Sequence, residues 1–557
     1  MRTLVRRPER SPTRRRGCPV PDLKVPVLVV GGSLTGLTTS VHLASQGVPH
    51  LLVERHRGTA VHPRAASFHQ RTMEIFRGVG LQDAVEAAAE KDFMQNGAIV
   101  SVSTLSSPEM QYFYRSFNEG VETFSATRRL FITQIGLEPV LRERARELGA
   151  ELRYGTELVN FEQDDEGITS VIRSRDDGQE VTVRSDYLVA ADGAHSTVRT
   201  RSGIDMVGRP PFAQCVTIYF HADMRELIGD RNLSVVYVNQ PDLLGFFRFS
   251  ITGDSGFLAV FSSQNPDGTR DTHVSEDLDE ERCVAFVRKA LGQPDIAVRV
   301  DDVQRWTAAA AHAASFRDRR VFLIGDAAHV MPPTGGFGGN TGIGDAHALA
   351  WRLALVSRGI AGPGLLDSYD DERRPVSDLI VEQAYTRYAL RVDPSLPREG
   401  LAAPLDDPSI ELGPVYRSGA VLLDGEDDGA LLVDPREPSG RPGARAPHVW
   451  VDVDGERLST HDLFGDGFVL LAGAEGQMWV DAAEQVAGAE RLPVCGFRVG
   501  PSGTVHDPAG AFPGAFGVGP AGAVLVRPDG VVAWRSAGPE ERPAAVLAEV
   551  MGQLLAR

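Results

Sequence analysis

Three short stretches of the chain combine glycine with acidic residues in a way that could bind a phosphate or a planar ligand. In the first, the apolar run Val25–Val30 leads into the turn Gly31–Gly36, and a helix is predicted from about Leu37 to Gln46. A second apolar run then ends at Glu54. This order of strand, glycine turn, helix, strand and acid is typical of the βαβ unit that binds dinucleotides.

The residue types of this turn have separate physical roles. Gly31 permits the tight turn, and Gly36 lets the helix pack closely on the strand. The start of the helix presents unpaired N–H groups to a pyrophosphate, and Glu54 is placed to accept hydrogen bonds from a ribose. Ser33 departs from the usual pattern, which has a second glycine there, but serine is small enough for the backbone to approach a phosphate.

The second stretch places an aspartate directly after an apolar strand. Tyr187–Ala191 runs into Asp192 and Gly193, and His195 and Arg199 follow within a few residues. A turn of this kind leaves the aspartate at the strand end, where a ligand could reach it.

The third stretch repeats this arrangement and adds a glycine-rich loop. The apolar run Val321–Ile324 leads into Gly325 and Asp326, and the loop Pro332–Asn340 precedes a helix that we predict from about Asp345. Glycines in such a loop let the backbone touch a planar or anionic ligand.

A further glycine pattern, Gly517–Gly522, has the dinucleotide spacing but lacks its context. No strand precedes it, and two apolar runs follow on either side of the turn Arg527–Gly530. Such a pattern predicts a β-hairpin and no phosphate site.

With these motifs in this order, the chain resembles the FAD-dependent class A aromatic hydroxylases of the p-hydroxybenzoate hydroxylase fold, from about residue 25 to the end. Within that family it is most similar to polyketide hydroxylases of the tetracenomycin and anthracycline types. The resemblance implies FAD as cofactor and NADPH or NADH as co-substrate. It places these residues at the cofactor: Gly31, Ser33, Gly36, Glu54, Arg55, Arg64, Gln134, Asp192, Gly193, Asp326, Gly335, Gly338, Gly339 and Asn340.

The same resemblance implies the chemistry. NAD(P)H reduces FAD, O₂ adds at the flavin C4a, and the distal oxygen of the C4a-hydroperoxyflavin passes to a phenolic ring of an aromatic polyketide or another polycyclic phenol. Pro332, Pro333 and Thr334 are expected near the reacting oxygen, and His195 and Arg199 are candidates for contact with NAD(P)H. Two alternatives stay open: a Baeyer–Villiger-type flavin monooxygenase on the same fold, and a flavin-binding partner protein without turnover.

We therefore expect an α/β fold with a Rossmann-like FAD domain, an interleaved β-sheet domain for the substrate and a thioredoxin-like C-terminal domain. Phe246, Phe247 and Arg248 are the substrate-contact candidates. The expected division is residues 25–90, 128–205 and 305–395 for the FAD domain, 91–127 and 206–304 for the substrate domain, and 415–557 for the C-terminal domain.

Composition excludes several other classes. The chain of 557 residues has a formal charge of −18, which argues against nucleic-acid binding. It has no apolar run long enough to span a membrane, and its four cysteines lie too far apart for a cysteine-only zinc site or a disulfide framework. We expect no metal, a cytoplasmic location, and a monomer or homodimer. Residues 1–24 carry eight basic and two acidic groups without an apolar segment behind them, so we expect a disordered arm and no signal peptide.

Overall fold

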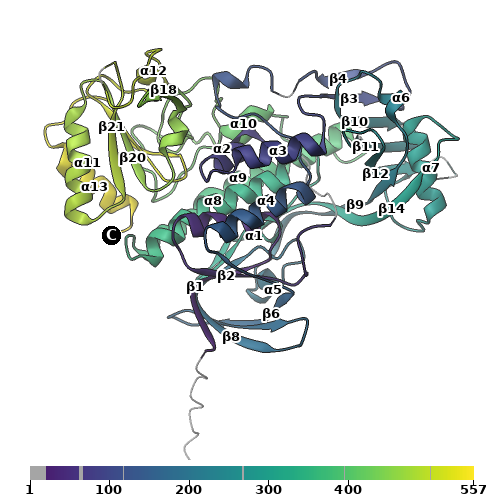
Figure 1. Ribbon diagram of the computed structural model, residues 1–557, viewed down its shortest axis with the longest axis horizontal. Helices are drawn as coiled ribbons and strands as arrows, with labels where there is room; N and C mark the ends of the chain where they lie inside the picture. The colour runs from purple at the N-terminus through teal and green to yellow at the C-terminus, as the bar shows by residue number, and fades with distance from the viewer. Residues whose placement is uncertain are drawn as a thin grey trace, which may run out of the picture.

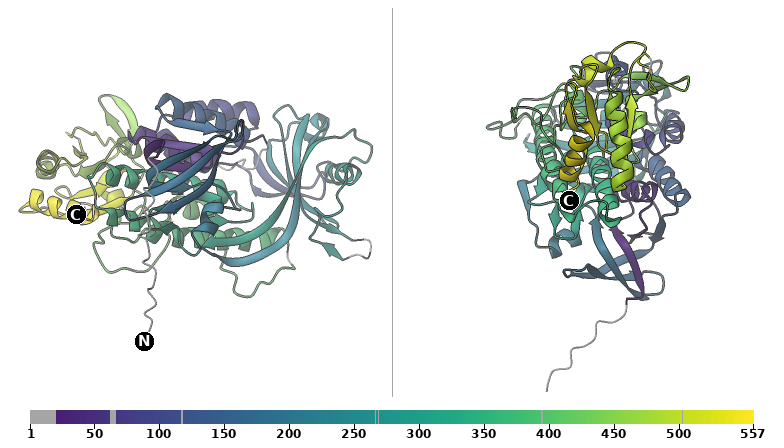
Figure 2. Two further views of the ribbon diagram at one scale, coloured as in Figure 1. Left: turned by 90° about the horizontal axis from the view of Figure 1, so that it is seen from below. Right: turned by 90° about the vertical axis from the view of Figure 1, so that its left-hand side faces the viewer.

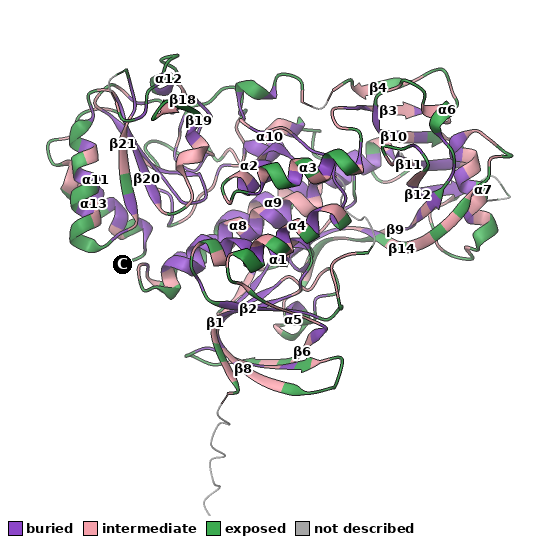
Figure 3. Ribbon diagram, viewed as in Figure 1, coloured by how far each residue is buried: buried purple, intermediate pink, exposed green. Residues whose placement is uncertain are grey.

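The computed structural model describes residues 21–61, 67–116, 118–265, 267, 269–393, 395–501 and 503–557. Two large sheets and a smaller C-terminal sheet surround a group of long helices (Figure 1). The helices at the centre are the most deeply buried, as the burial colouring shows (Figure 3). The expected α/β architecture is confirmed.

The first sheet has the strand order β15-β16-β8-β1-β2-β5, and β6 and β7 extend it from β8. Its five strands from β16 to β5 are parallel. The bounds are β1 Leu23–Val30, β2 His50–Glu54, β5 Glu151–Tyr154, β6 Thr156–Gln163, β7 Ile168–Ser174, β8 Glu180–Ala190, β15 Arg317–Asp318 and β16 Val321–Leu323. The inner strands are continuously apolar because they lie in a shared core, where Ile172 of β7 and Leu349 of α8 pack with them.

The start of β1 corrects the boundary of the expected arm. Leu23 and Lys24 pair with Val183 and Arg184 of β8, so these two residues belong to the sheet. The strand extends back because β8 is long enough to offer them backbone partners. Residues 1–20 lie outside the part of the chain that the structure describes.

Helices α1 (Leu34–Ser45), α4 (Gln134–Glu147) and α8 (Phe337–Ser357) pack against one another beside this sheet. Helix α9 (Asp367–Arg391) lies along α8 and continues toward the second sheet, and α2 (Gln70–Arg77), α3 (Gln82–Asp92) and α10 (Asp407–Leu412) lie on the other side of these helices (Figure 1). Helix α8 starts eight residues before the predicted position, because Gly336, with φ +71°, ends the loop and lets the helix begin at once.

The second sheet has nine strands in the order β17-β14-β9-β12-β11-β10-β3-β4, with β13 paired to β12. The bounds are β3 Ala98–Val102, β4 Gln111–Tyr114, β9 Met206–His221, β10 Leu233–Gln240, β11 Leu243–Phe249, β12 Ser255–Gln264, β13 Arg270–Asp271, β14 Arg299–Ala313 and β17 His329–Val330. Pairing of β3 with β10 unites the two strand-rich segments expected to form the substrate domain. Helix α7 (Glu280–Leu291) covers the outer face of this sheet.

The C-terminal part contains a four-stranded sheet with the order β21-β20-β22-β23. Its main elements follow one another as β20 (Phe468–Ala472), α11 (Gln477–Glu490), β21 (Val494–Arg498), β22 (Ala523–Val526), β23 (Val532–Ser536) and α13 (Pro543–Leu554). This βαβ–ββα order is that of the expected thioredoxin-like unit. The predicted hairpin is confirmed, since β22 and β23 pair across the turn Arg527–Gly530.

Among the described residues, no helix has the length and apolar character that crossing a membrane would require.

Candidate functional site

The carboxyl ends of the parallel strands gather the three sequence motifs at one edge of the first sheet. Gly31 follows β1, Glu54 ends β2, Asp192 follows β8 and Gly325 follows β16. In open α/β sheets this edge is where ligands bind. The motifs thus meet although more than a hundred residues separate each from the next.

The turn after β1 is so tight that its glycines cannot be replaced without collision. Gly31 has φ +109°, and a Cβ there would lie 2.2 Å from the carbonyl oxygen of Ala191. A Cβ on Gly36 would lie 1.9 Å from the carbonyl oxygen of Gly31. The start of α1 therefore sits directly against the ends of β1 and β8, with its first N–H groups toward the edge.

Glu54 holds this turn from the end of β2. Its Oε2 accepts a hydrogen bond from the Gly32 N–H at 2.7 Å, and its Oε1 accepts one from the His56 N–H at 2.8 Å. A carboxylate can accept about four hydrogen bonds, so Glu54 retains capacity for a ribose hydroxyl. The side chain of Arg55 is exposed.

Ser33 joins a polar group that the sequence did not reveal. Its hydroxyl donates to Glu138 Oε1 at 2.5 Å, and Gln134 Nε2 donates to Ser33 Oγ at 2.6 Å. Glu138 is fully buried, and its other oxygen accepts from the Ala60 N–H at 2.6 Å. The serine thus ties α1 to the start of α4. The i,i+4 spacing of Gln134 and Glu138 indicates that these two side chains share one face of a helix, but nothing in the sequence linked them to Ser33.

Asp192 follows β8 and binds the start of the short helix α5 (Thr197–Arg201), whose N-cap is Ser196. Its carboxylate accepts hydrogen bonds from Ser196 Oγ at 2.5 Å and from the Val198 N–H at 3.1 Å. Gly193 has φ +84°, which lets the chain turn away from the sheet.

The two NAD(P)H candidates in this segment differ in environment. Arg199 is buried and donates to the carbonyl oxygens of Ala327 at 2.8 Å and Ala194 at 2.9 Å. It therefore joins the second motif to the third. His195 is exposed.

The third motif rests on Asp345, a buried residue of α8. Asp345 Oδ2 accepts from the Gly325 N–H at 3.0 Å and lies 2.7 Å from His329 Nε2, while Oδ1 accepts from Arg373 Nε at 2.9 Å. Burial alone would raise the pKa of Asp345, but its electrostatic interactions with His329 and Arg373 and its hydrogen bonds outweigh burial and hold that pKa below its ordinary value. Asp326, beside Gly325, is exposed at the edge.

Hydrogen bonds fix the glycine-rich loop from behind. Asn340 Oδ1 accepts from the His69 N–H at 2.9 Å and from Thr72 Oγ1 at 2.7 Å, and its Nδ2 donates to the carbonyl oxygen of Gly336 at 2.7 Å. Thr334 Oγ1 donates to the carbonyl oxygen of Ala384 on α9 at 2.6 Å.

The front of this loop is backbone with few side chains. A Cβ on Gly338 would meet only Met331, at 3.9 Å. Pro332 is buried, whereas Pro333 is exposed. The loop therefore offers an open, flat surface at the start of α8.

An aromatic wall lines the inner face of the second sheet. The rings of Phe113 on β4, Tyr237 on β10 and Phe246 on β11 follow one another with centroid distances of 5.8 Å. Phe246 continues the contact to Phe257 and Phe261 on β12, at 5.9 and 5.8 Å. The alternation of side chains along β4 could have revealed Phe113, but pairing across four strands was not visible in the sequence.

Strand alternation separates the three substrate-contact candidates. Phe246 faces the wall, whereas Phe247 faces the opposite side and packs in the core beneath α7 with Cys283 and Phe286. Arg248 is buried with its guanidinium 3.8 Å from the ring centroid of Phe93, and this burial lowers its pKa to about 9. The structure thus does not bring Phe247 together with the other two.

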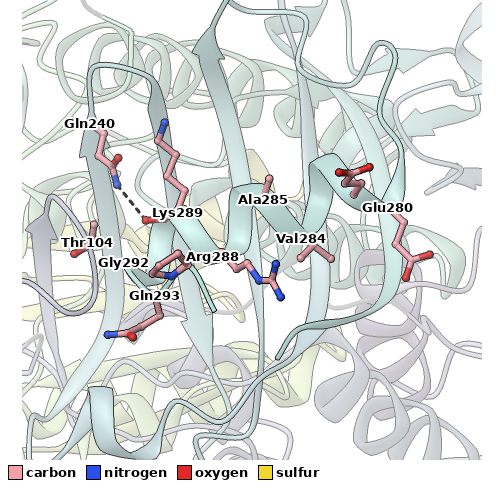
Figure 4. A pocket seen from close by; sticks show the side chains of 11 residues that line it. Thr104, Gln240, Glu280, Val284, Ala285, Arg288, Lys289, Gly292 and Gln293 are labelled. Carbon is pink, nitrogen blue, oxygen red and sulfur yellow. Dashed lines mark hydrogen bonds between the residues drawn. The ribbon is translucent and has the colours of Figure 1, made fainter. Parts of the chain in front are cut away.

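The groove drawn in Figure 4 lies elsewhere, on the outer side of this sheet. It measures about 960 Å³ and is lined by α7, including Val284, Arg288 and Lys289, and by Gln240 of β10. None of the predicted site residues lines it, and α7 stands at the far end of the molecule from the motifs (Figure 1).

The edge fits a dinucleotide that carries a flat ring system. Two glycines leave no room for side chains where a pyrophosphate would pass, an acid stands at the ribose position, and the backbone of the loop is open to a planar group. The fold and this edge define a flavin-dependent oxidoreductase with a separate aromatic wall on its second sheet. Arg64, the remaining cofactor candidate, lies outside the described residues.

Comparison with known proteins agrees with this class. The sequence matches the family described as "FAD binding domain" over residues 24–384 and the one described as "Aromatic-ring hydroxylase, C-terminal" over residues 439–557. The chain belongs to the FAD-dependent aromatic-ring hydroxylases. It is a flavin monooxygenase with FAD as cofactor, and NAD(P)H is the co-substrate typical of this family.

Individual relatives cover nearly the whole chain. A 4-methyl-5-nitrocatechol 5-monooxygenase of a Burkholderia species is 48% identical over 96% of this chain and 98% of its own. The tetracenomycin A2 monooxygenase-dioxygenase of Streptomyces glaucescens is 38% identical, covering 96% and 97%. Among solved structures, a complex of aklavinone-11 hydroxylase with FAD and aklavinone is similar with a TM-score of 0.90 and 40% identity, covering 97% of this chain and 100% of that one.

Proposed function

We propose that this enzyme hydroxylates a phenolic ring of a polycyclic aromatic substrate, such as an aromatic polyketide, with O₂ as the oxygen source. The observation that carries the substrate class is the aromatic wall from Phe113 through Tyr237 and Phe246 to Phe261. Phe113, Tyr237 and Phe246 are half-buried and lie on three strands, whereas Phe261 is buried behind them against Tyr388 and Trp306. A single benzene ring would cover only part of the surface that these three rings form. Burying a flat polycycle there would gain hydrophobic and ring–ring contacts together.

A monocyclic nitrophenol is the second candidate substrate. The nitrocatechol monooxygenase is 48% identical to this chain over almost its full length, which favours shared chemistry. Both candidates are phenols, but a nitro group withdraws electron density from its ring. The two would therefore differ in the reactivity of the ring as well as in how much of the wall they would cover.

The residues at the sheet edge would bind and orient the cofactor. The turn Gly31–Gly36 would receive the pyrophosphate, Glu54 the adenosine ribose and Asp326 the ribityl chain, with the loop Pro332–Asn340 against the ring system. Bound there, FAD supplies the activation of O₂ and the oxygen transfer. The hydroxyl of Thr334 already donates to Ala384, so we assign this residue to holding the loop in place.

A direct assay tests the substrate class. Purified enzyme is given NADPH or NADH, ¹⁸O₂ and a panel that spans one to four fused rings and includes 4-methyl-5-nitrocatechol. We expect the largest stimulation of NAD(P)H oxidation with the tri- and tetracyclic phenols, and a product that gains a single ¹⁸O as a ring hydroxyl. Preference for the nitrocatechol would favour the second candidate, and a lactone product would identify Baeyer–Villiger chemistry. Absence of any substrate-stimulated oxidation would indicate a non-catalytic flavin-binding protein.

Replacement of Asp326 tests the cofactor assignment. The side chain is exposed at the edge, so Asp326→Ala should fold and yet lose FAD, as shown by flavin absorbance after gel filtration. Retention of flavin by this variant would remove Asp326 from the site. The same column gives the oligomeric state, which we propose is monomer or homodimer. His195 stays the NAD(P)H candidate, because it is exposed and the guanidinium of Arg199 is held by two carbonyl groups.

A further inference from the structure

The hairpin turn Arg527–Gly530 of the C-terminal domain is inserted against the central helices of the rest of the protein. Arg527 has no solvent exposure and Asp529 only 3%. The indole Nε1 of Trp351 on α8 donates to Asp529 Oδ2 at 3.1 Å. A tight turn between two strands is ordinarily exposed, so its burial here marks a specific docking contact.

Four charged side chains meet at this contact. Arg527 donates two hydrogen bonds to Glu372 of α9, at 2.6 and 2.9 Å, and two to Asp529, at 3.0 and 2.6 Å. Arg352 of α8 donates to Glu372 at 2.6 Å. The group contains two arginines and two acids, so its charges balance. Buried charges are tolerated only with such partners, which makes the geometry of the contact strict.

Arg373, the residue next to Glu372, connects this contact to the edge of the first sheet where the cofactor is proposed to bind. Arg373 donates to Asp345 at 2.9 Å and to the carbonyl oxygen of Thr341 at 3.2 Å. Asp345 in turn accepts the N–H of Gly325, at the start of the third motif. Because Glu372 and Arg373 are neighbours on one helix, the ion group holds the turn of α9 that presents Arg373.

A second set of hydrogen bonds connects the hairpin turn to the glycine-rich loop through α2. Arg71 Nη2 donates to the carbonyl oxygen of Asp529 at 2.5 Å. Thr72, the next residue, donates to Asn340 of the glycine-rich loop at 2.7 Å. The same turn therefore contacts both α9 and α2. On α9 it binds Glu372, which is next to Arg373, and on α2 it binds Arg71, which is next to Thr72.

We infer that the turn Arg527–Gly530 is a positioning element of the FAD site, so that the C-terminal domain sets the geometry of the cofactor loop. The inference rests on the site residues proposed above. Among the cofactor candidates that the structure describes, the turn contacts none directly. It acts through the pairs Glu372–Arg373 and Arg71–Thr72.

The test compares two arginines of the same domain. Arg527→Met removes the docking contact, and Arg527→Lys keeps the charge but loses the two-point hydrogen bonding to Glu372. Arg535→Met is the matched control, since Arg535 of β23 pairs with Asp424 and with carbonyl groups of its own domain. The dissociation constant of FAD is measured by flavin fluorescence at a temperature where far-UV circular dichroism shows every variant folded. The visible circular dichroism of the bound flavin is recorded as well.

We expect Arg527→Lys to weaken FAD binding about tenfold and to alter the visible circular dichroism, with a larger change for Arg527→Met and none for Arg535→Met. If Arg527→Met does not fold, Arg527→Lys decides the question. Wild-type FAD affinity and spectrum in a folded Arg527→Lys would overturn the inference, even if its melting temperature fell. If instead Asp326→Ala kept its flavin, the proposed site would fail while the effect of Arg527 could still be measured.

Discussion

Asp345 organises the third cofactor motif although it lies outside the motif, on α8. It is fully buried, and its two oxygens bind a backbone N–H, the ring of His329 and the guanidinium of Arg373. Asn340 has a similar role on the other side of the loop, where its amide binds four groups. Asp345 and Asn340 thus hold the loop from behind, and the residues expected to touch the ligand are backbone groups and the acids Glu54, Asp192 and Asp326, of which Asp326 is exposed.

Replacing Asp345 should therefore damage folding and cofactor binding together. Asp345→Asn leaves the buried cation of Arg373 without its carboxylate partner, and we expect a loss of about 3–5 kcal/mol in the free energy of unfolding at neutral pH. Because the pKa of Asp345 is lowered in the folded protein, its stabilisation is present above its unfolded pKa of about 3.9 and is lost as the pH falls below that value. Urea unfolding at pH 7 and near pH 3 measures the difference between variant and wild type. A difference that stayed the same at both pH values would contradict the assignment.

Glu411 of α10 should have the opposite pH dependence. Its carboxyl is buried among Arg129, Arg387 and Asp407, and burial, aided by Asp407, raises its pKa from 4.5 to about 8. The folded chain then holds a proton that the unfolded chain has released, so stability falls as the pH rises from about 4.5 to 8, by at most about 1.4 kcal/mol per pH unit from this group. Glu411→Gln should flatten the melting temperature between pH 5 and 8. Parallel curves for wild type and variant would show that Glu411 does not titrate there.

At the scale of elements, apolar runs and glycines predicted the strands of the first sheet and the edge where they end well. The strands that end at Gly31, Glu54, Asp192 and Gly325 are all found, because a buried parallel strand has a continuous apolar sequence. The sequence predicts the start of α8 too late, because the glycines within Phe337–Asn340 disfavour a helix, whereas in the structure Gly336 ends the loop and the helix begins directly after it.

The aromatic wall was predicted only in part, since Phe246 was a candidate but its neighbours on the wall were not. Phe246 and Phe247 are equally apolar, and the choice of face depends on which side of β11 is covered by α7. Which side α7 covers is decided by tertiary packing, which the local sequence of β11 does not show. Likewise Phe113 and Tyr237 become neighbours only because β4, β3 and β10 pair although they are distant in sequence.

Phe246 and Phe247, neighbours on opposite faces of β11, provide a matched test of the wall. Phe246→Ala removes a half-buried ring from the inner face and should raise KM for a polycyclic phenol about tenfold, with little change in melting temperature. Phe247→Ala opens a cavity in the core and should cost about 3–5 kcal/mol in unfolding free energy, with a smaller effect on KM. Steady-state kinetics and thermal melts of both variants give the comparison. Equal effects of the two substitutions on KM would remove the wall from the substrate site.

At the scale of the whole molecule, α8 connects the parts. Its 21 residues extend about 30 Å, from the glycine-rich loop at its start to the C-terminal domain at its end. Figure 2 shows that domain beside the helices at one end of the elongated molecule and the second sheet at the other. Trp351 and Leu355 of α8 lie in one hydrophobic cluster with Trp479, Leu525 and Met551 of the C-terminal domain. The separate domain expected from composition therefore shares a core with the rest of the chain.

Removing the C-terminal domain should for this reason abolish folding of the remainder. A chain that ends at Pro414 keeps α10, would expose the apolar side chains of Trp351 and Leu355, and would leave Arg352 and Glu372 without Arg527 and Asp529. Exposed apolar area of this kind promotes aggregation, and unpaired charges at the surface do not restore the packing that is lost. We expect the truncated chain to be insoluble or to lack fixed tertiary structure and bound flavin, as judged by yield, near-UV circular dichroism and flavin absorbance. A soluble, yellow fragment with wild-type FAD affinity would show that the domain is dispensable, and would contradict both the shared core and the positioning role of its hairpin turn.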